Sequence, residues 1–221
     1  MMPRPIHDEY LLDYAAGSAP EAVSVLVASH LELCPAARAT LARLEAVGGA
    51  FLEQLPPAGL SPATIEAVFA KLDSTPQEIR AALPPMHGVA GLPKALTPYI
   101  PEGGIEALQW RKASRGFEEA MLTRQGPHAM SLLRSTNGGR VPTHSHTGTE
   151  LLLVLDGSFH DERAVYARGD VSIGDGDVMH SPTVDRGQNC LCLAVDDGAA
   201  RLPGMTGRLL NPFLRWYAKA R

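Results

Sequence analysis

The sequence predicts a multidomain α + β protein, in which a small N-terminal helical bundle precedes a C-terminal antiparallel β-barrel. Up to about Asp73, apolar residues recur at intervals of three and four, which is the period of an amphipathic helix. From about Glu106, short apolar runs alternate with Gly, Asn and Asp turns, as in a β-sandwich or barrel. A stretch rich in Pro, Gly and Ala separates the two patterns. We therefore expect a helical domain over residues 1–75, a linker over 76–98 and a barrel domain over 99–215.

Four helices are expected in the N-terminal part. The first ends at Gly17, a residue type that suits a helix C-cap, and Ser18 opens the second with a glutamate at the capping-box offset. Pro35 suits the first turn of the third helix, and Pro62 begins the fourth. The apolar face of this fourth helix carries Ile65, Val68, Phe69 and Leu72. A bundle of about 75 residues is marginal by itself, so a metal or a partner would help to stabilise it.

Short strands are expected in the C-terminal part. They cover residues 107–110, 117–122, 129–134, 150–155, 171–173 and 190–195. The Pro- and Gly-rich stretch from Ser74 to Pro101 predicts a linker between the two halves. We expect each half to fold with few contacts to the other.

Composition excludes several classes of protein. The chain has 221 residues and a net charge of −4, so it lacks the basic surface of a protein that binds nucleic acid directly. It has no apolar run long enough for a transmembrane helix, and its N-terminus does not read as a signal peptide, so we expect a cytoplasmic protein without a membrane partner. Its three cysteines lack the spacing of a disulfide framework.

The strongest chemical signal is a group of metal-ligand residues in the second half. His144, His146 and Glu150 share one parity, so all three can face the interior of a barrel from one strand. His180 follows a Gly- and Asp-rich turn and can supply a fourth ligand. Imidazoles with a carboxylate suit zinc, iron, manganese or nickel.

These residues resemble the motifs of the cupin superfamily. The first cupin motif is matched at Gly138, His144, His146, Glu150 and Gly157. The second motif is matched at Gly169 and His180, while Asp175, Asp177 and Val184 depart from its Pro, Gly and Asn positions. The resemblance implies a conical antiparallel barrel, a double-stranded β-helix, with zinc or another divalent transition metal inside.

A second, weaker group of candidate ligands lies near the N-terminus. His30 and Cys34 are one helical turn apart, and His7 lies near the start of the first helix. Together with Tyr14 to Gly17, this segment resembles the zinc-binding anti-sigma domain, and with the barrel behind it the whole chain resembles the ChrR-type anti-sigma factors. The family motif has Cys where this chain has Ala37. Because structural zinc sites are nearly always four-coordinate, a zinc site here is weakened, completed by another group or abandoned.

Two functions follow as expectations. The resemblance implies a regulator that sequesters an extracytoplasmic-function sigma factor and releases it under oxidative or related stress, with the metal-binding barrel needed for release. The alternative is a metal-dependent cupin enzyme, of oxygenase or isomerase type, with an accessory helical domain. The residues show no separate general base or nucleophile, so we name no catalytic residue and expect no enzyme. Cys190 and Cys192 share one strand face, and they are either core thiols or a redox sensor.

Overall fold

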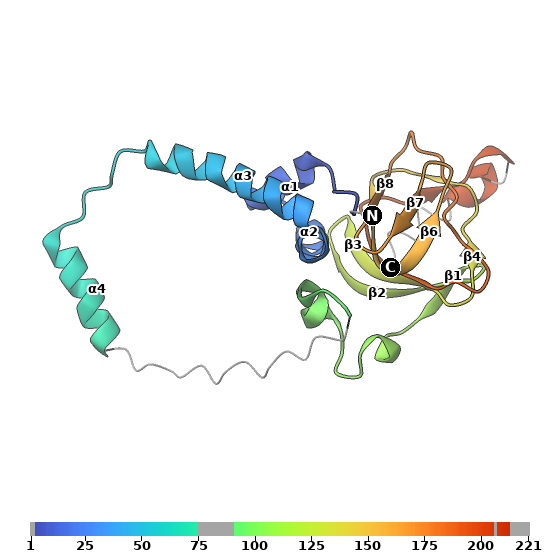
Figure 1. The fold of residues 1–221 in the computed structure, drawn as a ribbon, viewed down its shortest axis with the longest axis horizontal. Helices are drawn as coiled ribbons and strands as arrows, with labels where there is room; N and C mark the ends of the chain where they lie inside the picture. The colour runs from blue at the N-terminus through green and yellow to red at the C-terminus, as the bar shows by residue number, and fades with distance from the viewer. Residues whose placement is uncertain (1–2, 75–90, 206, 213–221) are drawn as a thin grey trace.

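The computed structural model describes residues 3–74, 91–205 and 207–212. Figure 1 shows a β-barrel with the N-terminal helices on one side of it. The α-helices are α1 (Asp8–Ala15), α2 (Glu21–Leu33), α3 (Pro35–Glu53) and α4 (Pro62–Ser74), and two short 3₁₀ helices, η1 (Lys94–Tyr99) and η2 (Ile105–Ala107), lead into the barrel. No helix in these ranges is long and apolar enough to cross a membrane.

The first three helices pack together, but α4 does not join them. Leu11 of α1, Leu26 and Val27 of α2 and Ala37 of α3 are buried in one cluster. Every described side chain of α4 is exposed, and Figure 1 shows α4 apart from the other helices. The expected bundle of four helices is therefore a bundle of three, with the fourth helix left without a packing partner in the described structure.

The barrel consists of antiparallel strands. They are β1 (Arg111–Ser114), β2 (Phe117–Gln125), β3 (His128–Ser135), β4 (Gly139–Arg140), β5 (Ser145–His146), β6 (Glu150–His160), β7 (Val165–Ala167), β8 (Val171–Gly174), β9 (Thr183–Val184), β10 (Cys190–Asp196) and β11 (Ala200–Arg201). The main sheet runs β1-β2-β3-β10-β6-β9-β4, with β7 and β8 also paired to β6, and β11 pairs with β5. The cupin-like barrel expected from the sequence is confirmed.

The prediction of a first strand at residues 107–110 is wrong. Residues 105–107 form η2 instead, and β1 begins at Arg111. The Trp110 indole N–H donates to the carbonyl of Ile105 at 2.8 Å, and the Arg134 guanidinium lies over the Trp110 ring. These side-chain contacts fold the segment back on itself, so that it does not extend into a strand.

The two faces of the central strands build two separate cores. On β6, Leu151, Leu153 and Leu155 belong to the cluster that contains the helices. Leu152 and Val154 belong to the cluster inside the barrel. Successive residues of a β-strand point to opposite faces, so β6 supplies apolar side chains to both faces of the sheet. The outer face of the barrel is therefore apolar and must be covered from water.

Helix α2 covers this outer face. Its residues Leu26 and Val27 lie in one buried cluster with Leu153 and Leu193 of the barrel. The glutamate at the end of α2, Glu32, also accepts hydrogen bonds from two backbone N–H groups at the start of η1. The helices and the barrel thus share a core, which differs from the expectation of few contacts between the halves. Residues 76–90 of the expected linker lie outside the described residues. Its residues 94–98 belong to η1 instead, and Leu96 is buried in the shared core.

Candidate metal centre

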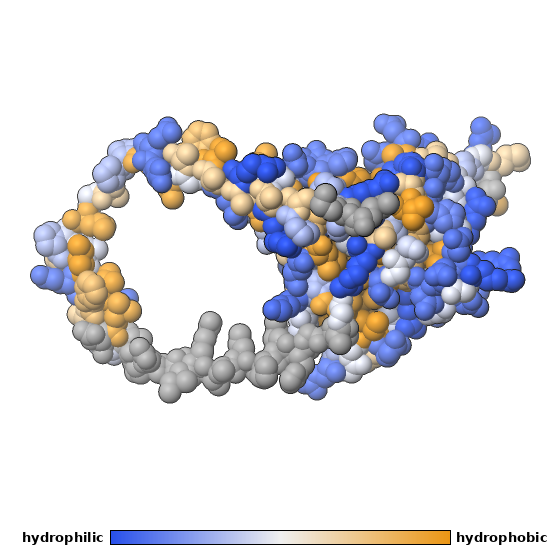
Figure 2. All heavy atoms as spheres, in the orientation of Figure 1, coloured by the Kyte–Doolittle hydropathy of each residue, from blue (hydrophilic) through white to orange (hydrophobic). Residues whose placement is uncertain are grey.

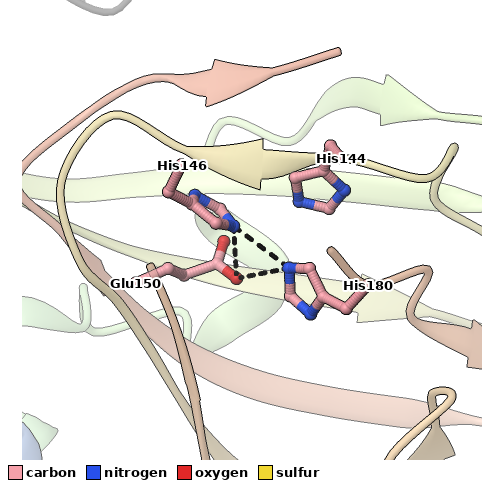
Figure 3. A group of neighbouring side chains, drawn as sticks. All are labelled: His144, His146, Glu150 and His180. Atoms are coloured by element: carbon pink, nitrogen blue, oxygen red, sulfur yellow. Dashed lines mark hydrogen bonds and ion pairs between the residues drawn. The ribbon is translucent and has the colours of Figure 1, made fainter. Parts of the chain in front are cut away.

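Four candidate ligands converge inside the barrel. His144 and His146 come from the segment around β5, Glu150 begins β6 and His180 lies in the loop before β9. His144 and His180 exchange backbone hydrogen bonds of 3.0 and 2.9 Å, which fixes the two loops against each other. The side chains of all four residues point toward one another (Figure 3). Among the described residues, these four are the one group of three or more His, Cys, Asp or Glu side chains that could hold an ion.

The turn before His180 is built by an aspartate side chain. The carboxylate of Asp175 accepts hydrogen bonds from the backbone N–H groups of Asp177 and Val178, at 2.9 and 3.0 Å. This is an Asx turn, a local arrangement that aspartate favours. The Asp175 carbonyl also accepts from the His146 N–H at 3.1 Å. The departure from the cupin motif at Asp175 and Asp177 therefore preserves the turn that presents His180.

The spacing of the donor atoms fits a metal ion. His146 Nε2 lies 3.1 Å from His180 Nε2 and 3.4 Å from Glu150 Oε2, which is 3.8 Å from His180 Nε2. All four donor atoms lie within 4.8 Å of one another. Ligands at about 2.1 Å from a tetrahedral zinc ion are separated by about 3.4 Å, which matches these distances.

Neighbouring groups orient two of the rings. His144 Nδ1 lies 2.9 Å from the carbonyl of Pro142, so it donates there and leaves Nε2 as the ligand atom. His180 Nδ1 is buried and makes no hydrogen bond to the described residues, but the Asp161 carboxylate is 3.7 Å away. A carboxylate behind a histidine ligand is a common means of fixing the ring and raising its basicity.

Burial controls protonation in the cluster. Desolvation raises the pKa of Glu150 to about 7 and lowers the pKa of His146 to about 4 and that of His180 to about 3. The histidines are therefore neutral at pH 7 and their lone pairs are available to a metal. A cation would in turn favour the charged form of Glu150, because opposite charges at close range stabilise one another.

A cavity of about 420 Å³ adjoins the cluster inside the barrel, and His144, His146 and Glu150 line it. Cys190 and Cys192 also line it, with their sulfur atoms 3.5 Å apart. The contact with Cys190 and burial raise the pKa of the Cys192 thiol. Because the thiolate is the reactive form, this environment favours the expectation of core thiols over that of a redox pair.

The N-terminal candidates do not converge. His7 points to solvent with 68% of its side chain exposed, while His30 and Cys34 are buried. Ala37 is fully buried, in the position where the family motif has a cysteine. The structure therefore does not bring His7, His30 and Cys34 into one ligand group.

His30 instead connects three parts of the chain. Its Nε2 accepts the backbone N–H of Ile6 at 3.2 Å, so its Nδ1 carries the proton and donates to the carbonyl of Gly169 at 3.0 Å. Both ring nitrogens are used, and burial lowers the pKa of His30, which favours the neutral ring. Gly169 belongs to the turn between β7 and β8, so this ring attaches α2 and the N-terminal segment to the barrel.

A second contact supports this attachment. The Asp170 carboxylate accepts the backbone N–H groups of Arg4 and Ala167. Gly169 has φ +90°, and a Cβ there would lie 3.0 Å from Pro3. Sequence reasoning missed Asp170 and the role of Gly169, because nothing in the local pattern indicates that residues so far from His30 in the chain lie against it. We call His30, Gly169 and Asp170 the helix anchor.

Comparison with known proteins agrees with both parts of the fold. Residues 103–199 match the family described as the ChrR Cupin-like domain. Anti-sigma-E factor ChrR of Cereibacter sphaeroides is 37% identical over 210 residues, which cover 95% of this chain and 97% of that protein. The crystal structure of Rhodobacter sphaeroides SigE in complex with the anti-sigma ChrR matches with a TM-score of 0.72 at 37% identity, over 89% of this chain and 100% of the matched chain.

The similarity includes the N-terminal helices as well as the barrel. A free-standing cupin enzyme has no need of those helices, so similarity over the full length favours a regulator over an enzyme. The chain belongs to the ChrR family of anti-sigma factors.

Proposed function

We propose that the N-terminal helices hold an extracytoplasmic-function sigma factor inactive, and that the metal-binding barrel governs its release under oxidative or related stress. One observation carries this proposal. The described structure leaves a long apolar surface on α3 and α4 uncovered, in a chain similar over its full length to a protein crystallised with its sigma factor.

This uncovered surface, which we call the apolar strip, extends from the C-terminal half of α3 to the end of α4. Its exposed large side chains are Val47, Phe51, Leu52, Leu55, Leu60, Ile65, Val68, Phe69 and Leu72. Phe51, Leu52 and Phe69 each expose more than 60% of their surface. Figure 2 shows apolar residues along these two helices. A group of large exposed apolar side chains of this kind marks a protein interaction site.

The geometry of the strip suits helix-in-groove binding. Ile65, Val68, Phe69 and Leu72 are spaced by three, one and three residues, so they lie on one side of α4. Because α4 is not packed against the barrel or α1–α3, it is available to a partner without unfolding anything else. Residues 1–75 would then form the binding part, residues 76–98 the linker and residues 99–215 the sensing part.

We assign the metal to His144, His146, Glu150 and His180. Three neutral imidazoles and one carboxylate suit zinc and other divalent transition metals. When bound, such a metal supplies cross-links between the β5 segment, β6 and the loop that carries His180. A stress that disturbs this site would reach the helices through β8, which pairs with Glu150 at Gly174 and leads from Gly169 and Asp170 of the helix anchor.

Co-purification tests the binding role. The full chain is co-expressed with each extracytoplasmic-function sigma factor of its own genome, and complexes are separated by size exclusion. We expect one of them to form a one-to-one complex. The variant Phe69→Asp should abolish the complex, because it places a charge in the apolar strip.

Ala67→Asp is the matched control, since successive helix residues are rotated by about 100° and Ala67 therefore lies on the other side of α4. This variant adds the same charge and should leave the complex intact. If no sigma factor binds, or if Ala67→Asp and Phe69→Asp weaken binding equally, the proposed function is wrong.

A further inference from the structure

The barrel cavity next to the candidate metal ligands has the size of a small-molecule site. Its volume of about 420 Å³ corresponds to roughly 14 water-sized groups, at about 30 Å³ per water. Its walls are mainly apolar, with Phe117, Leu133, Leu152 and Phe159 among them. Pockets for small ligands combine walls of this kind with a few placed polar groups.

One of those polar groups is a hydroxyl without a partner. Ser131 is 1% exposed and lines the cavity. Its Oγ makes no hydrogen bond to any described residue. Its neighbours on β3, Met130 and Leu132, face the helices, so Ser131 faces the barrel interior. Because buried polar groups are nearly always hydrogen-bonded, this hydroxyl calls for a partner within the cavity.

The charges around the cavity indicate the sign of a ligand. Arg111 and Lys112 line it on one side, and they balance the carboxylates of Glu119 and Asp196, which also line it. A divalent metal bound by neutral histidines and the Glu150 carboxylate would leave one net positive charge. A ligand with a single negative charge and an apolar body satisfies both the charge and the walls.

We propose that this cavity binds a medium-chain monocarboxylate, whose carboxylate lies beside the four-ligand metal centre as its counter-charge and whose binding uses the Ser131 hydroxyl. The proposal rests on the proposed function in one respect, the metal at His144, His146, Glu150 and His180. It goes beyond that function by giving the barrel a small-molecule ligand. A monoanion is favoured over a phosphate ester, because a dianion would exceed the net charge available.

Calorimetric titration of the full chain with decanoate tests the proposal. Decanoate has about twelve non-hydrogen atoms, so it fits a cavity of roughly 14 water-sized groups. We expect one decanoate per metal-loaded chain, and at least tenfold weaker binding after the metal is removed. 1-Decanol has a body of the same length without the charge and should also bind at least tenfold more weakly.

Two serine variants distinguish the loss of a hydroxyl inside the cavity from the general effect of removing a buried hydroxyl. Ser131→Ala should weaken decanoate binding about ten- to hundredfold, the effect of one hydrogen bond to a charged group. Ser135→Ala is the matched control, because Ser135 lies on the same strand, is buried and also lacks a hydrogen-bond partner in the described structure, but does not line the cavity. It should bind decanoate like the unmodified chain. If Ser131→Ala does not fold, Leu133→Phe narrows the cavity instead and should also weaken binding.

Measuring sigma-factor binding on the same samples separates the two proposals. Metal-loaded chain that binds a sigma factor but not decanoate would overturn the ligand proposal and leave the proposed function standing. Equal affinity for decanoate and 1-decanol, or equal affinity of the Ser131→Ala and Ser135→Ala variants, would also overturn it. Chain that binds decanoate but no sigma factor would leave the cavity assignment intact and reject the proposed function.

Discussion

Histidine side chains serve different purposes in two regions of this molecule. In the barrel, His146 and His180 place their Nε2 atoms 3.1 Å apart, beside the largely buried carboxylate of Glu150. Among the helices, the two nitrogens of His30 are taken by the backbone of Ile6 and Gly169. The barrel histidines direct free lone pairs at a common point, whereas His30 accepts one hydrogen bond and donates another, so it has no free lone pair for a metal.

The barrel contributes to the stability of the small helical domain. Three helices of this length make a marginal core. In this chain, α2 adds Leu26 and Val27 to a cluster that contains Leu153 and Leu193 of the barrel. In the described structure a shared apolar core, with the buried His30 at its edge, holds these helices, and Ala37 lies where the family motif has its fourth ligand.

The largest expected effect comes from breaking the barrel site. His146→Ala removes a ligand between Glu150 and His180, and we expect metal content to fall from about one equivalent per chain to almost none. Elemental analysis of the purified protein measures it. His160→Ala is the control, because His160 is a half-exposed barrel histidine outside the ligand group, and its metal content should not change.

Breaking the helix anchor should instead lower stability and spare the metal. His30→Ala leaves the N–H of Ile6 and the carbonyl of Gly169 without partners and opens a cavity, so we expect a loss of about 2–4 kcal/mol in the free energy of unfolding. Chemical denaturation measures this loss. A variant that lost its metal while keeping its stability would show that His30 is a ligand after all.

A smaller loss in the free energy of unfolding is expected from a substitution at Gly169, on the barrel side of the helix anchor. Gly169→Ala puts a Cβ on a residue with φ +90°, 3.0 Å from Pro3. Strain of this kind costs about 1–3 kcal/mol. Gly187→Ala is the matched control, since Gly187 has φ +80° with no atom near its Cβ position. A larger loss at Gly169 than at Gly187 would measure the contact with the N-terminal segment separately from backbone strain.

The smallest expected effect is a dependence on pH. Burial lowers the pKa of His30, while Asp170 beside it acts in the opposite direction. The unfolded chain therefore binds a proton at His30 more readily than the folded chain. The contribution of His30 is complete above its ordinary pKa of about 6.5 and is lost as the pH falls below that value.

Denaturation of the unmodified chain and of His30→Gln, at about pH 7.5 and about pH 5.5, isolates this contribution from the other histidines. The unmodified chain should lose more stability on acidification than the variant. Equal losses would show that His30 does not titrate with folding.

Local patterns predicted much of this structure. The four helices begin and end close to the expected residues, and the barrel ligands His144, His146, Glu150 and His180 meet as expected. The expectation that the first three share one strand was wrong, because β5 ends at His146 and β6 begins at Glu150. The strand expected at residues 107–110 failed because Trp110 bonds back to Ile105, a side-chain contact that strand propensity does not describe.

The contacts between residues far apart in the chain could not be predicted from the sequence. His30 and Gly169 are separated by 139 positions, and no local feature of either residue indicates the other. The separation of α4 from the bundle was also hidden, because an apolar helical face looks the same whether it packs within the chain or awaits a partner.

We expect the barrel to hold one metal ion and the helices to hold none. Elemental analysis of the full chain, loaded with zinc and freed of excess metal, tests this expectation most directly. We predict one zinc per chain, lost in His146→Ala and retained in Cys34→Ser. Two zinc ions per chain, or loss of one zinc in Cys34→Ser, would contradict the account and restore a metal site among the helices.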